Sequence, residues 1–506
     1  METTSFLIAG VLLLLPLAVL LRNADRQRRG LPPGPPAVPL FGNLLWLRNS
    51  AADVEPLLLG LFKKYGPIVT LRIGSRLSIF VADRHLAHQA LIGAGVALAD
   101  RPQAATSSLL GVTDNIITRA NYGPVWRLLR RNLVSETLHP SRVKLFAPAR
   151  AWVRRVLMEK LRDEETPDVM EAFQYSMFCL LVLMCFGERL DEPAVRAIEN
   201  AERAWLLYIS RKLTVFFFLP SITKHLFRDR LRVAHGLRMR QRDLFVPLIQ
   251  TRREYKKGHR QATETTFQHS YVDTLLDVTL PEEGNRPLTD DEIVALCSEF
   301  LNAGTDTTST GLQWIMAELV KNPAVQDKLY DEIKATCGDQ DEEVSEDKIE
   351  AVKMPYLKAV ILEGLRKHPP GHFVLPHKAA QDMQVGGYLI PKGTTVNFMV
   401  AEMGRDEGTW DKAMEFVPER FLEDDNKLAT VDMYGTKGIK MMPFGVGRRI
   451  CAGLSIAMLH LEYFVANMVK EFEWKEVAGK EVDFAEKREF TTVMANPLRP
   501  RLVPRN

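Results

Sequence analysis

One cysteine of this chain has a setting that suits metal chemistry. The stretch PFGVGRRICAG, residues 443–453, places Cys451 among three glycines and two arginines. A reactive or metal-binding cysteine is a thiolate, which needs a lowered pKa and hydrogen-bond donors near its sulfur. Gly447 and Gly453 allow backbone N–H groups to approach, Arg449 suits a ligand carboxylate, and the apolar helix expected next favours a thiolate through its dipole. The alternative is a structural cysteine buried in a glycine-rich turn.

A second unusual stretch, EFLNAGTDTTSTGLQWIMAEL at residues 299–319, lies inside a helical pattern. Its centre contains Ala303, Gly304, Asp306 and Thr307, although glycine and threonine are poor helix formers. Small residues leave room for a bulky group against the backbone, and a helical hydroxyl can bond the carbonyl four residues earlier. Asp306 and Thr307 therefore suit proton delivery. A kinked packing site is the alternative.

Two further pairs have helical spacing. Glu363 and Arg366 share one helix face, and the later stretch PERF contributes Arg420, which can complete a buried charge cluster. A solvated pair of little energetic value is the alternative. Trp126 and Arg130, four residues apart, can donate together to one anion, and the alternative is a core tryptophan beside a surface arginine.

The elements that must position these residues are mainly helical. The 506 residues are 46% hydrophobic and 25% charged, which is ordinary for a globular body. Residues 84–370 have mostly helical patterns, whereas 71–83 and 383–390 predict short β segments and 256–270 a polar surface loop. A net charge of +3 gives no reason to expect a nucleic acid partner. Five cysteines without a CxxC argue against a disulfide framework or a cysteine-rich zinc site.

The first segment predicts attachment to a membrane. Residues 5–21 are uncharged, and four arginines follow between positions 22 and 29. Charge placed after the apolar run is typical of an uncleaved anchor that keeps the body cytosolic, and a cleaved signal peptide is the alternative. Residues 31–43 are proline-rich and form a linker or a rigid spacer. We therefore expect a membrane anchor at 1–21, a basic and proline-rich linker at 22–43, and the main body at 44–506.

Taken together, these motifs closely resemble those of the cytochrome P450 monooxygenases. The fixed positions of that family's haem-binding signature, FxxGxRxCxG, are matched by Phe444, Gly447, Arg449, Cys451 and Gly453. The stretch at 303–308 is similar to the family's oxygen-activation motif, and the order and spacing of the motifs agree over the whole chain, anchor included. The finer resemblance is to plant microsomal members of the A type, nearest to family 89, subfamily A, with family 77 as a neighbour.

The resemblance implies a mainly α-helical cytochrome P450 fold with a small β part, preceded by one transmembrane helix, with residues 44–506 as the catalytic domain. It implies haem b as cofactor, with Cys451 as the thiolate ligand of the iron and with Asp306 and Thr307 as the proton relay. The side chains that it places at the haem propionates are Trp126, Arg130, His377 and Arg449. Its buried Glu-Arg-Arg cluster corresponds to Glu363, Arg366 and Arg420.

The implied reaction inserts one oxygen atom from O2 into a small apolar plant metabolite. The electrons would come from NADPH through a membrane-bound cytochrome P450 reductase, and the protein would lie in the endoplasmic reticulum membrane as a single-pass protein with a cytosolic catalytic domain. A basic docking face for the reductase is expected from four side chains: Arg131, Lys437, Lys440 and Arg448.

The substrate is left open by the sequence. Fatty acids, phenolics, terpenoids and linear tetrapyrroles are all compatible with the resemblance. Residues 216–218, all phenylalanine, are expected either to line the pocket or to enter the bilayer, and Phe373, Val374 and Met494 to line the pocket. Two other functions remain as alternatives: a haem-thiolate isomerase or dehydratase, which the Asp306–Thr307 pair disfavours, and a non-catalytic haem protein.

Overall fold

The computed structural model describes residues 30–37, 42–43, 54–73, 76–103, 105–163, 166–217, 220–337, 342–352, 354–423 and 427–505. The predicted membrane anchor at 1–21 and the arginines after it lie outside these residues. Within them, one helix is long and apolar enough to cross a membrane, Val169–Phe186, and 89% of it is buried inside the protein.

Helices dominate the described chain, as predicted, and the β part is small. The α-helices are α2 (Glu55–Tyr65), α3 (Arg84–His88), α4 (Ala105–Leu110), α5 (Pro124–Asn132), α6 (Pro140–Val143), α7 (Ala147–Arg162), α8 (Val169–Phe186), α9 (Glu192–Lys212), α10 (Pro220–Leu226), α11 (Arg228–Lys256), α12 (Tyr271–Leu275), α13 (Asp290–Lys321), α14 (Pro323–Thr336), α15 (Glu346–Val352), α16 (Pro355–Lys367), α17 (Val400–Gly404) and α18 (Leu454–Glu471). The strands are β1 (Ile68–Ile73), β2 (Arg76–Val81), β3 (Thr279–Leu280), β4 (Arg286–Pro287), β5 (His377–Lys378), β6 (Met383–Val385), β7 (Tyr388–Ile390), β8 (Thr395–Phe398), β9 (Phe472–Lys475), β10 (Glu486–Arg488), β11 (Thr492–Met494) and β12 (Arg501–Pro504).

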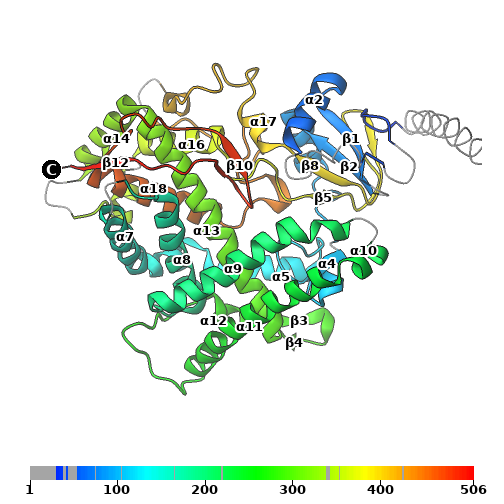
Figure 1. The fold of residues 1–506 in the computed structure, drawn as a ribbon, viewed down its shortest axis with the longest axis horizontal. Helices are drawn as coiled ribbons and strands as arrows, with labels where there is room; N and C mark the ends of the chain where they lie inside the picture. Colours follow the sequence, from blue (N-terminus) through cyan, green and yellow to red (C-terminus); the bar gives the residue numbers. More distant parts are fainter. Residues whose placement is uncertain are drawn as a thin grey trace, which may run out of the picture.

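The largest sheet has four strands in the order β1-β2-β8-β5. The hairpin predicted near 71–83 is the antiparallel pair β1 and β2, and β8 joins it in parallel with Val81 opposite Phe398. The segment predicted at 383–390 is the hairpin of β6 and β7. Figure 1 shows the four-stranded sheet with α2 at one end of the molecule, while helices fill the rest. The sheet thus forms a side unit of a helical body.

The long helix α13 runs through the middle of the helical body (Figure 1). Its start is fixed by a capping box in which Thr289 and Glu292 bond each other's backbone N–H, and three acidic residues in the first turn suit the positive end of the helix. Most of its residues are buried, and it packs against α8 and α18. A helix held on several sides in this way is a rigid support for the stretch that contains Asp306 and Thr307.

The described part of the proline-rich segment lies against the body. The carbonyl of Pro33 accepts from the N–H of Thr70 on β1 at 2.8 Å, and that of Gly30 accepts from the N–H of Leu389 on β7 at 2.8 Å. The amide of Asn43 donates to the carbonyl of Pro36 at 3.0 Å. Hydrogen bonds of this kind are what a rigid spacer needs.

Candidate functional site

The loop before Cys451 is shaped by a glycine. Gly447 has a φ of +73°, and a Cβ at this position would lie 2.4 Å from the carbonyl oxygen of Leu91, so only glycine fits. The turn Gly447–Arg449 is followed by a hydrogen bond from the N–H of Cys451 to the carbonyl of Phe444, at 2.9 Å. Helix α18 begins at Leu454, three residues after the cysteine. The close approach that the sequence predicted at Gly447 is therefore to the backbone at Leu91.

The thiol of Cys451 has an open face. Cys451 is exposed, whereas the other four cysteines are buried and reduced. Although part of the residue is accessible, the protein around the sulfur shields it from water and raises the pKa of the thiol, which the N–H of Gly453 and the charge of Arg130 oppose. A metal bound at the sulfur deprotonates a thiol outright, so the site suits a thiolate only when a metal is present.

Arg449 and Trp126 meet beside this loop. The guanidinium of Arg449 lies 4.5 Å from the centre of the Trp126 ring, and the indole N–H donates to the carbonyl of Ile117 at 3.1 Å. Arg449 makes three hydrogen bonds, all to backbone carbonyls: Ala99 at 2.7 Å, Ile117 at 3.0 Å and Ala120 at 2.5 Å. A guanidinium carries more N–H donors than these, so Arg449 can bind a further acceptor.

Two other arginines have the same type of partner. Arg130 donates to the carbonyl of Ile450, the residue before the cysteine, at 2.6 Å. Arg101, which the sequence analysis did not single out, is 7% exposed. Its bonds also go to backbone carbonyls: Thr118 at 3.2 Å, Leu375 at 2.7 Å and Pro376 at 2.9 Å.

These three arginines have no ion-pair partner within the described chain, although the more distant charges of Asp100 and Glu299 act on Arg449. None of Arg101, Arg130 and Arg449 forms an ion pair with a carboxylate of the described residues. Burial, aided by the charge of Arg449, lowers the pKa of Arg101 to about 9, and burial lowers the pKa of Arg449 to about 10. Buried cations with only neutral partners are stabilised by an anion that brings its own charge. The arrangement is therefore suited to a ligand with carboxylates.

His377 lies in the same region but does not act as a donor to an anion in this structure. Its Nδ1 lies 2.7 Å from the carbonyl of Leu98, and because a carbonyl only accepts, Nδ1 carries the proton. Burial and the nearby cations Arg101 and Arg449 lower the pKa of His377 to about 3. The ring is therefore neutral and its Nε2 is an acceptor. Contact with a propionate would require a second proton, which an anion beside the ring would favour.

The centre of α13 has the local structure that the sequence predicted. The hydroxyl of Thr307 donates to the carbonyl of Ala303 at 2.7 Å. Ala303 is exposed although most of the helix around it is buried. Gly304 was expected to leave room for a bulky group against the helix. Instead it faces α8, where a Cβ would lie 2.7 Å from a methyl group of Leu181. The open side of the helix is thus at Ala303 and Thr307, and the glycine allows close packing of two helices.

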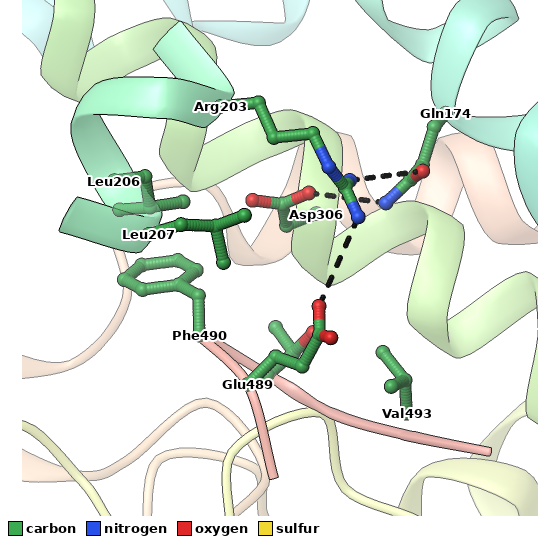
Figure 2. A pocket seen from close by; sticks show the side chains of 9 residues that line it. Gln174, Arg203, Leu206, Leu207, Asp306, Glu489, Phe490 and Val493 are labelled. Atoms are coloured by element: carbon green, nitrogen blue, oxygen red, sulfur yellow. Dashed lines mark hydrogen bonds and ion pairs between the residues drawn. The ribbon is translucent and has the colours of Figure 1, made fainter. Parts of the chain in front are cut away.

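Asp306 faces a small cavity between α13, α8, α9 and the hairpin of β10 and β11, and the cavity has both polar and apolar side chains in its lining (Figure 2). Its carboxylate accepts from the amide of Gln174 at 3.4 Å, and the oxygen of that amide accepts from Arg203 at 3.2 Å. Arg203 in turn lies 3.9 Å from Glu489. Burial raises the pKa of Asp306 to about 6, with Arg203 acting against the rise and Glu489 adding to it. A carboxyl with this pKa exchanges protons readily near neutral pH.

The structure also brings together the predicted charge cluster. Glu363 and Arg366 are fully buried and form two hydrogen bonds, at 2.6 and 2.7 Å. Arg420 adds a contact to Glu363 at 3.2 Å. Arg366 also donates to the carbonyl of Gly404 at 2.6 Å, so the cluster joins α16 to segments that precede the cysteine loop.

Some pocket residues expected from the sequence have core positions. Phe216 is fully buried and packs with Trp205 and Leu213, so the interpretation that it enters the bilayer is wrong. Met494 is 2% exposed, and Phe373 packs edge-on against Phe80 with ring centres 6.4 Å apart. Phe218 and the side chain of residue 217 lie outside the described part of the chain.

Comparison with known proteins agrees with this geometry. Residues 32–502 match the cytochrome P450 family, so the chain belongs to that family, and it is a P450 monooxygenase, an oxidoreductase. It is similar to cytochrome P450 89A9 of Arabidopsis thaliana, with 46% identity over 94% of each chain, which confirms the resemblance to family 89, subfamily A. It is also similar to geraniol 8-hydroxylase of Catharanthus roseus (30% identity, 94% of each chain) and to 5-epiaristolochene 1,3-dihydroxylase of Nicotiana tabacum (29%, covering 94% of this chain and 93% of the relative).

Proposed function

We propose that this protein holds haem b with Cys451 as the iron ligand and hydroxylates a small apolar plant metabolite with O2 and electrons from NADPH. The observation that carries the proposal is the exposed Cys451 beside one buried arginine, Arg101, and two half-buried ones, Arg130 and Arg449, which form no ion pair with a carboxylate of the described residues. Haem b supplies both missing groups, an iron for the sulfur and two propionates for the cations. When bound through a thiolate, its iron activates O2 for insertion into a substrate.

The cysteine side of the site would hold and tune the cofactor. The N–H of Gly453 lies next to the sulfur and stabilises its negative charge, as does the charge of Arg130. Arg449, Arg101 and Arg130 would bind the propionates with the N–H donors that they do not use within the protein. His377 would join them only in its protonated form. The single N–H of Trp126 is already bonded to the carbonyl of Ile117, so the indole would reach a propionate only by giving up that bond.

The α13 side would hold and move protons. The hydroxyl of Thr307 donates to the carbonyl of Ala303, which leaves its oxygen free to accept a proton donor on the open side of the helix. Asp306, with a pKa of about 6, would take protons from the cavity of Gln174, Arg203 and Glu489 and pass them toward the reacting oxygen.

We propose that the protein lies in the endoplasmic reticulum membrane through residues 1–21 and receives electrons from an NADPH-dependent cytochrome P450 reductase. Its expected docking side chains, Arg131, Lys437, Lys440 and Arg448, are all exposed, and Arg448 donates to the hydroxyl of Tyr122 at 2.8 Å. The names of two relatives contain geraniol and 5-epiaristolochene, which are small and mainly apolar compounds. This supports a substrate of the same type.

The proposal is tested with the full-length protein in detergent or nanodiscs. We expect the reduced, carbon monoxide-bound spectrum to show the band of thiolate-ligated haem, and Cys451→Ala to abolish it. Thr307→Ala should keep the band but release much of the reducing equivalents as hydrogen peroxide when reductase, NADPH and a substrate are present. A Cys451→Ala protein with an unchanged band would contradict the proposal, and full coupling in Thr307→Ala would remove that hydroxyl from the proton route.

A further inference from the structure

The residues between α4 and α5 connect two sides of the site. The peptide unit of residues 117 and 118 is bonded at both ends to groups of other elements. Its carbonyl, that of Ile117, accepts from Trp126 at 3.1 Å and from Arg449 at 3.0 Å. Its N–H, that of Thr118, donates to a carboxylate oxygen of Glu299 on α13 at 2.6 Å. One peptide group thus stands between a carboxylate and a guanidinium.

Glu299 makes further bonds to the same segment. Its second oxygen accepts from the N–H of Ile117 at 2.9 Å, and the hydroxyl of Thr118 donates to its first oxygen. Three donors on one carboxyl group favour its ionised form, while burial raises its pKa. Glu299 therefore takes the N–H groups of a segment whose carbonyls are taken by the propionate-binding side chains.

The carbonyls of this segment set the direction of several side chains. In addition to the bonds of Ile117, the carbonyl of Thr118 accepts from Arg101 at 3.2 Å and that of Ala120 accepts from Arg449 at 2.5 Å. The segment has no helix or strand to hold it. The N–H groups of residues 119 and 120 bond the carbonyl of Ile116 within the turn, at 3.2 and 2.8 Å. The N–H groups at 117 and 118 bond Glu299 instead, so this carboxylate is what ties the turn and its carbonyls to α13.

We propose that Glu299 is a positioning residue: from α13 it anchors the 117–120 turn at the N–H groups of Ile117 and Thr118. The carbonyls of that turn in turn aim Arg449 and Arg101 at the haem propionates and hold the indole of Trp126 in place. The negative charge of Glu299 also acts on Arg101 and Arg449 without an ion pair to either. The cofactor end of the site is thereby coupled to the helix that carries Asp306 and Thr307. This inference rests on the proposed haem site.

The experiment compares Glu299→Gln with the wild-type full-length holoprotein. The amide is similar in shape, but the two backbone N–H groups bond different oxygens of the carboxylate, so in the variant one of them faces an NH2 group, which cannot accept. We expect haem transfer to apomyoglobin to be roughly tenfold faster, as for the loss of a buried hydrogen bond to a charged group. The reduction potential should become more positive because a negative charge near the haem is removed. Glu299→Asp, which keeps the charge, should restore the potential in part.

Glu318→Gln is the matched control, because Glu318 is a buried carboxylate on the same helix with other partners, Lys367 and His368. It should lower thermal stability without moving the potential. A Glu299→Gln protein with wild-type haem loss and potential would overturn this inference while leaving the proposed function intact. If the wild-type protein itself lacks the thiolate-haem band, the proposed function has failed instead. Should Glu299→Gln not fold, Glu299→Asp and Thr118→Val provide the same two readouts with smaller expected changes.

Discussion

Buried arginines occur in two clusters of this protein, and the two clusters are neutralised differently. Around Glu363, one fully buried carboxylate bonds Arg366 twice and Arg420 once. Around Cys451, Arg449 and Arg101 bond only backbone carbonyls, and their pKa values fall to about 10 and about 9. The first cluster is complete within the protein, and the second is complete only with an anion.

The difference separates a cluster that holds the fold from one that holds a ligand. A buried ion pair costs desolvation, and it persists where its geometry is good and its remaining donors are satisfied, as they are at Gly404 and Glu363. In the second cluster, the desolvation cost of the arginines is offset only when a ligand carboxylate binds. Substitutions in the first cluster should therefore lower the unfolding free energy with or without haem, whereas substitutions in the second should mainly lower the affinity for haem.

The largest effect is expected from Glu363→Gln. Removing the carboxylate leaves two buried or half-buried guanidinium groups without their counter-charge, at a cost of about 3–5 kcal/mol in unfolding free energy. The loss should appear in urea unfolding of both the haem-free and haem-bound protein. The control is Glu283→Gln, since Glu283 and Arg286 have the same sequence spacing but are 41% and 35% exposed. An exposed pair should cost less than about 1 kcal/mol, and equal losses in the two variants would remove the distinction.

Arg130→Met should act in the opposite manner. We expect haem affinity to fall roughly tenfold through loss of a charge-assisted contact, while the unfolding free energy of the haem-free protein changes little. Haem titration of the apoprotein and urea unfolding measure the two quantities. Arg127→Met is the control, because Arg127 is exposed on the same helix α5. A large loss of apoprotein stability with unchanged haem affinity would place Arg130 with the structural cluster.

A smaller effect, on pH dependence, is expected at Asp306. Its carboxyl is protonated below a pH of about 6 and ionised above it, so the coupling of NADPH oxidation to product should change near that pH. Arg203→Gln removes a cation that lowers the pKa of Asp306, and the change should move to higher pH. Glu489→Gln removes an anion that raises this pKa, and the change should move to lower pH. Shifts of the same sign in both variants would exclude Asp306 as the titrating group.

The smallest effect is expected at the surface. Lys437→Glu with Lys440→Glu should slow the first electron transfer from the reductase roughly three- to tenfold at low ionic strength, with little difference at high salt. Stopped-flow reduction under carbon monoxide measures this rate. Arg232→Glu on α11 is the control, since Arg232 is among the most exposed side chains, at 81%. A salt-independent defect in the lysine variant would point to misfolding of the site.

Sequence reasoning found the parts of the site that are close together in the chain. The glycines and arginines around Cys451 lie within one stretch of eleven residues, and Glu363 and Arg366 lie on one helix face. Thr307 bonds the carbonyl four residues earlier because helical spacing alone fixes that contact. These contacts join residues that are close in the chain, so their spacing in the sequence is enough to predict them.

The missed residues act through contacts between distant segments. Arg101 reaches carbonyls at 375 and 376, Glu299 reaches the backbone at 117 and 118, and Gln174 reaches Asp306. No helical or strand periodicity in the sequence marks partners that lie so far apart in the chain.

The central claim is that the uncompensated arginines and the open thiol form one binding site for haem. Its most direct test is a haem titration of the full-length apoprotein, followed at saturation by reduction under carbon monoxide. We predict binding of one haem per chain with the thiolate-type band, and tighter binding of haem than of its dimethyl ester, which lacks the propionate charges. Equal affinity for the two compounds, or a band typical of histidine ligation, would contradict the claim.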